Sequence, residues 1–381
     1  MKLKKRILYI LFFAFLISCN YGNEESLKHQ QSKIKVAVFE GDGASVTCVL
    51  ETYESLKIDT GIEPSIITAA EISAGKIDDF DVIVFPGGSG SKELNNLGDL
   101  AAAKVHEFVN SGKGAVGICA GGYLFSTTKG YPSLQLVSAT EWDREHYDKG
   151  RALVEFKLTD IGDELLPELK NKKAFLQYYD GPVLMPADSG RSRTMDYTEY
   201  AKYVSDIAIH EGYPSGVTPG KTFLLGEEIG EGRAMVVAGH PESTPGMRWM
   251  VPRMARWAAK KELVKYKSKW VRPEINDAPI FYSTDLVKKE KEMFWHLTSD
   301  NTENKLMAMQ TLFEMRSRPA VRWNLGMLRD AAPEVRVKAA SLLKETEYTA
   351  ALHDLKLALE IETDSSVKTA LTDAIEFLSG F

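Results

Sequence analysis

The sequence predicts an α/β fold, a doubly wound parallel sheet with flavodoxin-like strand order. Two observations carry this prediction. Short apolar runs bounded by glycine recur between residues 34 and 238, and helical stretches alternate with them. In such folds ligands bind at the carboxyl edge of the strands, so residues directly after the runs are candidates for a site.

The elements follow in order along the chain. Run 34–39 is followed by a tight turn, and Ser45 is suited to cap a helix that extends to residue 56. The region from about 134 to 228 is richer in strand patterns. Expected strands are 34–39, 64–68, 81–85, 114–118, 152–158, 174–178, 205–209, 222–226 and 233–238, and the other expected helices include 70–76, 99–109 and 247–261.

The composition is that of a globular protein. The chain has 381 residues, 44% of them hydrophobic and 26% charged, with a net charge of −6. This length accommodates one large domain with an appendage. The mild acidity gives no support to a nucleic-acid partner.

The N-terminus has the pattern of an export signal. A basic stretch precedes an apolar run, 7–17, that is short for a membrane span. Leu16-Ile17-Ser18-Cys19 resembles the lipobox of bacterial lipoproteins, which implies that Cys19 carries a lipid anchor. We therefore expect a signal peptide at 1–19 and a flexible tether at 20–32. Residues 20 and 21 are not acidic, which favours the outer membrane of a bacterial cell envelope.

Cys119 is the first candidate for chemistry. It ends the run 114–118, and Gly121 and Gly122 follow it, so the pattern predicts a strand–turn–helix elbow that presents a thiol. By itself the motif leaves open an inert buried thiol. Cys48 lies on an apolar stripe of the first expected helix, and we interpret it as core.

A second glycine-rich turn, 86–90, follows the strand 81–85 at the same edge of the sheet. The backbone N–H groups of Gly88 and Ala120 are the expected oxyanion donors beside Cys119. Gly87 and Tyr179 are candidates to line the pocket, although a structural turn and a surface tyrosine are the alternatives.

His240 and Glu242 complete the constellation. They follow the strand 233–238, and Pro241 between them favours an extended segment with both side chains on one face. A carboxylate beside an imidazole orients the ring, and the imidazole accepts the proton of a thiol.

Together these residues resemble a known superfamily. The motifs Gly117-Ile118-Cys119-Ala120-Gly121 and His240-Pro241-Glu242 are similar to those of the class I glutamine amidotransferase-like fold. The segments 39–45, 179–182 and 239–242 most resemble the biotin–protein ligase N-terminal domain family, over residues 33–262. The resemblance implies Cys119 as nucleophile, His240 as base and Glu242 as orienting residue, with no cofactor and no metal. Glu40 is a pocket candidate because the cysteine protease branch of the superfamily places a glutamate there. No biotin-ligase, synthetase or ammonia-accepting domain follows, so the resemblance supplies no substrate.

The C-terminal part differs in pattern. Residues 263–285 form an irregular linker, and 286–381 are expected to be helical. The segment beginning at Pro333 recurs weakly at 365, a period of 32 that resembles HEAT-type repeats. Such helices either dock a protein partner or cap the first domain.

The sequence therefore supports two functions. One is a membrane-anchored, amidotransferase-like cysteine hydrolase that acts on an amide or acyl bond of a small molecule or peptide. The alternative is a non-catalytic lipoprotein that binds a small ligand or protein with the same pocket and the helical tail.

Overall fold

The computed structural model of the protein describes residues 32–142, 150–187, 197–207 and 215–380. Cys19, the expected signal peptide and all of the expected tether except Ser32 lie outside the described residues. Among the described residues, no helix combines the length and apolar character that crossing a bilayer requires.

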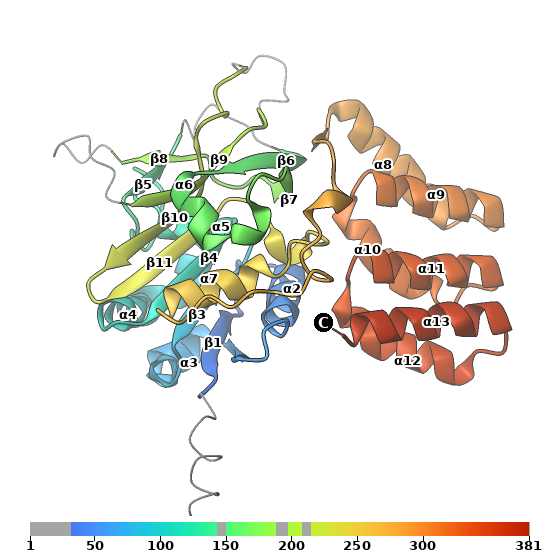
Figure 1. The fold of residues 1–381 in the computed structure, drawn as a ribbon, viewed down its shortest axis with the longest axis horizontal. Helices are drawn as coiled ribbons and strands as arrows, with labels where there is room; N and C mark the ends of the chain where they lie inside the picture. The colour runs from blue at the N-terminus through green and yellow to red at the C-terminus, as the bar shows by residue number, and fades with distance from the viewer. Residues whose placement is uncertain (1–31, 143–149, 188–196, 208–214, 381) are drawn as a thin grey trace, which may run out of the picture. The chain divides into compact units, whose positions relative to one another are not determined.

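Five parallel strands form the half of the sheet that carries the candidate site (Figure 1). Their order, β2-β1-β3-β4-β11, confirms the doubly wound, flavodoxin-like prediction. The strands are β1 (Ile34–Phe39), β2 (Ile62–Ile67), β3 (Val82–Phe85), β4 (Gly114–Ile118) and β11 (Gly232–Val237).

Alternate residues of these strands face two separate cores, which is why the apolar runs are continuous. In β1, Val36 and Val38 belong to the cluster under α2 (Val46–Leu56) and α7 (Met250–Ala258). Ala37 and Phe39 belong to the opposite cluster. That face is covered by α3 (Ala69–Ser73), α4 (Gly90–Asn110) and α5 (Ala120–Phe125).

The sheet continues beyond β11 with antiparallel strands, so it is mixed. β10 (Thr222–Ile229), β9 (Thr198–Tyr203), β6 (Arg151–Leu158) and β12 (Ile280–Phe281) follow in that order. β7 (Ala174–Tyr179) pairs with β6, and the short strands β5 (Ala139–Glu141) and β8 (Leu184–Pro186) pair with each other. α6 (Asp160–Leu165) follows β6.

The strand predicted at 205–209 is wrong in its described part, because residues 205–207 are not in a strand. The strand of this region is β9, which lies just before the predicted run in the chain. β9 fits between β6 and β10, and the Ser205 side chain accepts a hydrogen bond from the Glu155 N–H instead.

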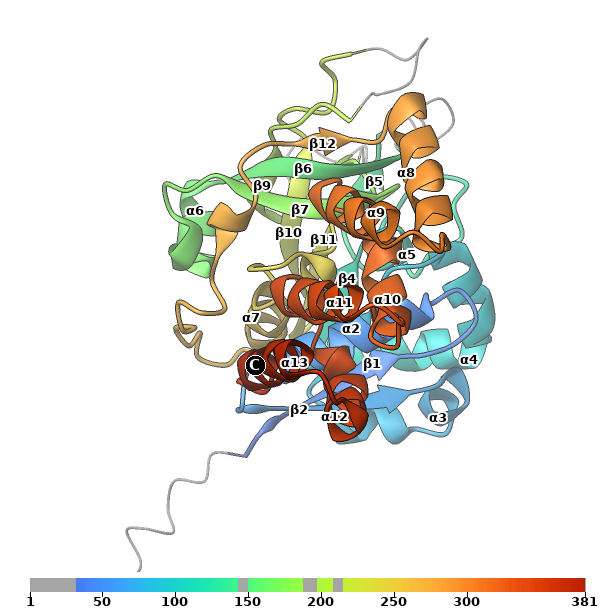
Figure 2. The ribbon, with the colours of Figure 1, turned by 90° about the vertical axis from the view of Figure 1, so that its right-hand side faces the viewer.

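The C-terminal part is helical, as predicted, and has a core of its own. Figure 2 shows its helices stacked in pairs, with the first pair at the top and the last pair at the bottom. They are α8 (Thr284–Leu297), α9 (Thr302–Glu314), α10 (Arg318–Met327), α11 (Pro333–Glu345), α12 (Leu352–Ile361) and α13 (Ser365–Leu378). The recurring segments begin α11 and α13, and Val335 and Val367, at equivalent positions, are both buried. The HEAT-type assignment stays a prediction.

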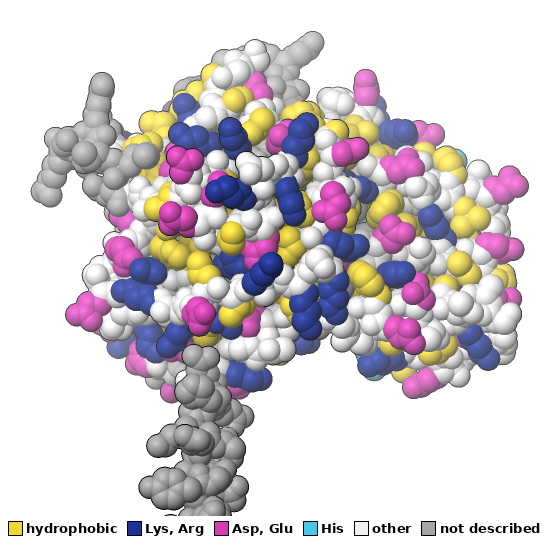
Figure 3. Space-filling model, in the orientation of Figure 1, with side chains coloured by type: hydrophobic (Ala, Val, Ile, Leu, Met, Phe, Trp, Pro, Cys, Tyr) yellow, Lys and Arg dark blue, Asp and Glu magenta, His cyan; other side chains and the backbone are white. Residues whose placement is uncertain are grey.

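Basic and acidic side chains are interspersed on the face that Figure 3 shows. This pattern accords with the small net charge of the chain. The described residues from Ile34 onwards belong to one compact unit.

Candidate active site

Cys119 occupies a strained turn between β4 and α5. Its backbone has φ 51° and ψ −100°, a conformation that residues with a side chain rarely adopt. The turn is held by the Cys119 N–H, which donates to the Val237 carbonyl at 2.9 Å. A Cβ on Gly121 would lie 2.5 Å from the Phe85 carbonyl oxygen, so the close approach of α5 requires glycine there. These features are those of a nucleophile elbow.

His240 and Glu242 lie together, but not in the way that the sequence predicted. Pro241 begins a 3₁₀ turn, Pro241–Ser243, rather than an extended segment. This turn places Nδ1 of His240 2.7 Å from Oε1 of Glu242. The extended expectation was wrong because proline is also favoured in the first turn of a helix. The pairing of the two side chains nevertheless forms.

The imidazole of His240 is buried, with 2% of its surface exposed, and lies between two thiols. Burial alone would lower its pKa, but interactions with Cys119 and with Glu242 raise the pKa of His240 well above its usual value. Burial would raise the pKa of Glu242, yet His240 holds it below its usual value. The Nε2 atom of His240 has no hydrogen bond of regular geometry to a described residue.

Tyr179 closes one side of the site. Its carbonyl oxygen accepts a hydrogen bond of 3.4 Å from Cys119 Sγ, and its ring lies 5.7 Å from the His240 ring, edge to face. The His240 N–H donates to the Gln177 carbonyl at 2.7 Å, so the end of β7 also fixes the histidine backbone. The end of β7 thus holds Cys119 and His240 against each other.

The glycine turn after β3 packs against the imidazole. A Cβ on Gly87 would lie 2.5 Å from His240 Cε1 and 2.9 Å from Cys48 Sγ, so this position leaves no room for a side chain. Beside it, the Ser45 N–H bonds to the Gly87 carbonyl and the Ser89 N–H to the Gly43 carbonyl. These bonds do not use the Gly88 N–H. The Ala120 N–H opens α5, where the first N–H groups have no intrahelical partner.

The structure places Cys48 in the site, although the sequence indicated a core residue. Cys48 is buried as expected, but its sulfur lies 3.2 Å from Nη2 of Arg318 and within 4.8 Å of donor atoms of His240 and Glu242. Burial would raise the pKa of the thiol, yet Arg318 and His240 lower the pKa of Cys48. Of its apolar neighbours on α2, Val49 is buried in the core, whereas Val46 is 70% exposed.

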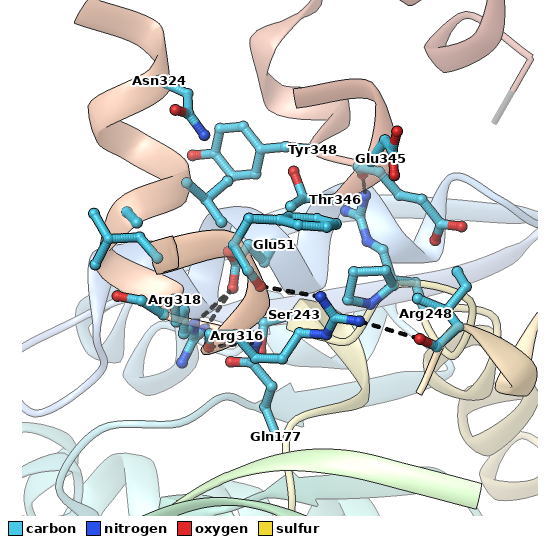
Figure 4. Close-up of a pocket in the computed structure, with 18 of the residues that line it drawn as sticks. Glu51, Gln177, Ser243, Arg248, Arg316, Arg318, Asn324, Glu345, Thr346 and Tyr348 are labelled. Atoms are coloured by element: carbon cyan, nitrogen blue, oxygen red, sulfur yellow. Dashed lines mark hydrogen bonds and ion pairs between the residues drawn. The ribbon is translucent and has the colours of Figure 1, made fainter. Parts of the chain in front are cut away.

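Arg318 is the second residue that sequence reasoning missed. It begins α10, in the C-terminal helical part, and its Nε and Nη2 donate to Oε2 of Glu51 (Figure 4). Nη2 also approaches Oε1 of Glu242 at 3.4 Å. Glu51, Glu242 and Arg318 line a small cavity of about 40 Å³. Gln177 and Arg248 also border this cavity. No local motif marks Arg318, since its partners lie up to 270 residues away.

This cluster is an ion-pair network. Cys48, His240 and Glu242 have the side chains of metal ligands, but Arg318 Nη2 contacts both the Cys48 sulfur and the Glu242 carboxylate. A cation bound to these donors would be repelled by the guanidinium. The donor set therefore does not fit a metal ion well.

Of the predicted site residues, the structure brings together Cys119, His240, Glu242, Gly87 and Tyr179. Gly88 and Ala120 flank the group through the two turns. It does not bring in Glu40, which is exposed at the end of β1 and makes no side-chain hydrogen bond or ion pair with a described residue.

Comparison with known proteins gives one family match. Residues 34–135 match the family model described as "Biotin-protein ligase, N terminal". The match includes Gly87 and Cys119 but ends before His240. No curated protein matches the chain.

Solved structures are similar over about three fifths of the chain. A putative ThuA-like protein from Parabacteroides merdae is 13% identical, with TM-score 0.42, over 61% of this chain and 92% of that one. The glutaminase domain of Trypanosoma brucei CTPS is 14% identical, with TM-score 0.41, over 62% and 97%. A β-galactosidase from Bacillus circulans sp. alkalophilus is 17% identical, with TM-score 0.38, over 61% of this chain and only 32% of its own. This chain thus spans about a third of that enzyme.

The sheet order, the cysteine elbow and the family match agree with one another. Residues 34–135 are thus similar to the biotin–protein ligase N-terminal family, and they lie in a mixed sheet of mostly parallel strands with flanking helices.

Proposed function

We propose that this protein is an amidotransferase-like cysteine hydrolase that acts on an amide or acyl bond. The carrying observation is the arrangement of His240, whose Nδ1 is bonded to Glu242 while its ring interacts with the Cys119 thiol. This is the order nucleophile, base and orienting carboxylate that activates a thiol. The strained backbone of Cys119 adds support.

The reaction follows from these roles. Cys119 loses its proton to His240 and its sulfur attacks the carbonyl carbon, so the carbonyl oxygen gains negative charge. The N–H groups of Gly88 and Ala120 are the donors proposed for that oxygen. The intermediate collapses to a thioester, and His240 returns the proton to the leaving amine or alcohol. Water, or an amine in a transfer reaction, then attacks the thioester and releases the acyl group.

Alkylation with iodoacetamide tests the activated thiol. We expect Cys119 to be alkylated at pH 7 and His240→Ala to slow this alkylation by at least about tenfold, because the imidazole accepts the thiol proton. Peptide mapping by mass spectrometry separates Cys119 from Cys48. The matched control is His296→Ala on α8, which among the described residues pairs with Glu292 at 3.8 Å and should leave the rate unchanged. Equal, slow alkylation in the wild type and in His240→Ala would refute the proposal.

One observation favours the second candidate function, ligand binding without turnover. The reacting groups are almost closed to solvent, with Cys119 5% and Glu242 0% exposed, and Arg318 lies among them. A protein that binds its ligand beside these groups, without chemistry at the sulfur, can keep Cys119 covered, whereas a hydrolase must admit a substrate to it. The alkylation rate of Cys119 distinguishes the two functions. A hydrolase needs an activated thiol, whereas a protein that only binds a ligand does not.

We further propose that the chain is a lipoprotein anchored through Cys19, on the strength of the lipobox pattern. In bacterial cells fed with labelled palmitate, the wild type should carry label and sediment with membranes. Cys19→Ala should lose both, since two or more acyl chains are needed for stable anchoring. Cys48→Ser serves as the control and should stay labelled. Label that persists in Cys19→Ala would overturn the proposal, and density-gradient separation of the two membranes tests the outer-membrane location.

A further inference from the structure

A cleft of about 850 Å³ lies between the start of α2 and helix α10. Its lining includes Ser45 and Thr47 from the α2 side and Arg318, Arg322 and Trp323 from α10. Two arginines line this cleft, and no Asp or Glu among the described residues does. The cleft is therefore electropositive, on a chain whose net charge is negative.

Arg322 is the cation of this cleft that no carboxylate neutralises. It is exposed, and its Nη1 donates to Thr47 Oγ1 at 3.3 Å. Among the described residues it forms no ion pair, whereas Arg318 is held by Glu51 and Glu242. A guanidinium that keeps free N–H donors in a concave site suits a carboxylate or a phosphate, which it can bind through two parallel hydrogen bonds.

The N-terminus of α2 adds positive partial charge to the cleft. Ser45 stands at the N-cap position but its side chain makes no capping hydrogen bond, so the first N–H groups of this 11-residue helix lack that partner. They contribute positive partial charge on the side of the cleft opposite α10. On α10, Trp323 is 42% exposed and offers an apolar wall.

The cleft adjoins the candidate active site through Tyr179, which lines it. The carbonyl of Tyr179 contacts the Cys119 sulfur, and its ring lies against His240. Arg322 follows Arg318 by four residues on the same face of α10, a separation of roughly 6 Å along the helix. Arg318 lies at the edge of the candidate active site. An anion bound at Arg322 would thus lie about one helical turn farther along α10 than Arg318.

We propose that this cleft binds an anionic group of the substrate, a carboxylate or a phosphate, through Arg322 and the start of α2, while the bond to be cleaved lies at Cys119. The proposal rests on the proposed function, in which Cys119 is the nucleophile. It assigns the substrate class as an acidic amide or acyl compound whose chain passes Trp323 and Tyr179. It also gives the C-terminal helices a part in substrate recognition.

The test uses alkylating probes that differ only in charge and reach. N-iodoacetyl derivatives of glycine, β-alanine and γ-aminobutyric acid carry a carboxylate at increasing distance, and their primary amides are the neutral partners. The measured quantity is the ratio of the Cys119 alkylation rates with acid and with amide, resolved by peptide mapping. The same ratio in the urea-unfolded chain is the reference for intrinsic reactivity.

We expect the folded protein to exceed the reference ratio by at least about tenfold for at least one probe length. Arg322→Gln should return the ratio to the reference, and Arg322→Lys should retain part of it. Arg329→Gln, an exposed arginine outside the cleft lining, should leave the ratio unchanged. Competition then separates the two sources of anion: succinate slows the acidic probe if a carboxylate is preferred, and inorganic phosphate slows it if a phosphate is preferred.

Two results would overturn the inference. One is a ratio equal to the reference at every probe length, and the other is a raised ratio that Arg322→Gln does not change. Neither result touches the proposed function, because the dependence of alkylation by neutral iodoacetamide on His240 tests that separately. Conversely, Cys119 alkylation could prefer the acidic probes and yet not depend on His240. The cleft would then bind anions, but the thiol beside it would not be activated.

Discussion

Replacing Arg318 with methionine is expected to lower the free energy of unfolding by about 3–5 kcal/mol. Arg318 is paired with Glu51 and Glu242, which are 5% and 0% exposed. Without the guanidinium, Glu51 loses its charge partner in a buried place. Burial already raises the pKa of Glu51 above its usual value. In the variant Glu51 would therefore take up a proton, and this would reduce the loss of stability.

Urea-induced unfolding at pH 7 measures this effect. The matched control is Arg322→Met, one helical turn farther along α10, which removes an exposed side chain with one hydrogen bond and should cost less than about 1 kcal/mol. The double variant Arg318→Met/Glu51→Gln should recover much of the stability, because the buried charge is removed together with its partner. A loss for Arg318→Met as small as that of the control would show that the network contributes little.

The second large effect concerns Glu93, in the first turn of α4. Its side chain is fully buried, and neither carboxyl oxygen has a hydrogen-bond partner among the described residues. Burial and the nearby Cys48 raise the pKa of Glu93 from 4.5 to about 8. In the folded protein the carboxyl therefore stays protonated at pH 7.

This pKa has a definite consequence for stability. Between pH 4.5 and about 8 the unfolded chain releases the Glu93 proton while the folded chain keeps it, so stability falls as the pH rises. At 1.36 kcal/mol per pH unit the total loss across that window is at most about 5 kcal/mol, and it is complete above pH 8. Glu93→Gln cannot ionise, so it should lack this part of the pH dependence.

The measurement is the unfolding free energy of wild type and Glu93→Gln at pH 5, 6, 7 and 8. The difference between the two proteins should shift in favour of the variant as the pH rises. Glu107→Gln is the control, because Glu107 is an exposed residue of the same helix that pairs with Lys104. It should give a difference that is nearly constant with pH. A constant difference for Glu93→Gln as well would mean that this carboxyl ionises normally in the folded state.

Much of the fold could be predicted because it depends on local pattern. The run 114–118 coincides with β4, and the helix predicted after Cys119 is α5. Apolar runs bounded by glycine determine such elements almost without reference to the rest of the chain. The strand expected at 205–209 failed because short alternating stretches compete, and the neighbouring strands selected β9.

In the candidate site, too, some features could be predicted from the sequence and others could not. Cys119, His240 and Glu242 could be predicted because each follows a strand of the parallel sheet, and strand ends meet at one edge. The conformation at Pro241 could not, since proline suits both an extended segment and the first turn of a helix.

By itself, the sequence determined the order of the parallel strands, the cysteine elbow and the pairing of His240 with Glu242. Only the tertiary structure decided that Cys48 belongs to the site and that Arg318, from α10, lies beside it. The reason is physical. The place of a strand end in the sheet follows from the residues next to it in the chain. The ion pair between Arg318 and Glu51 joins residues 267 positions apart, and it forms only when packing has removed both partners from water.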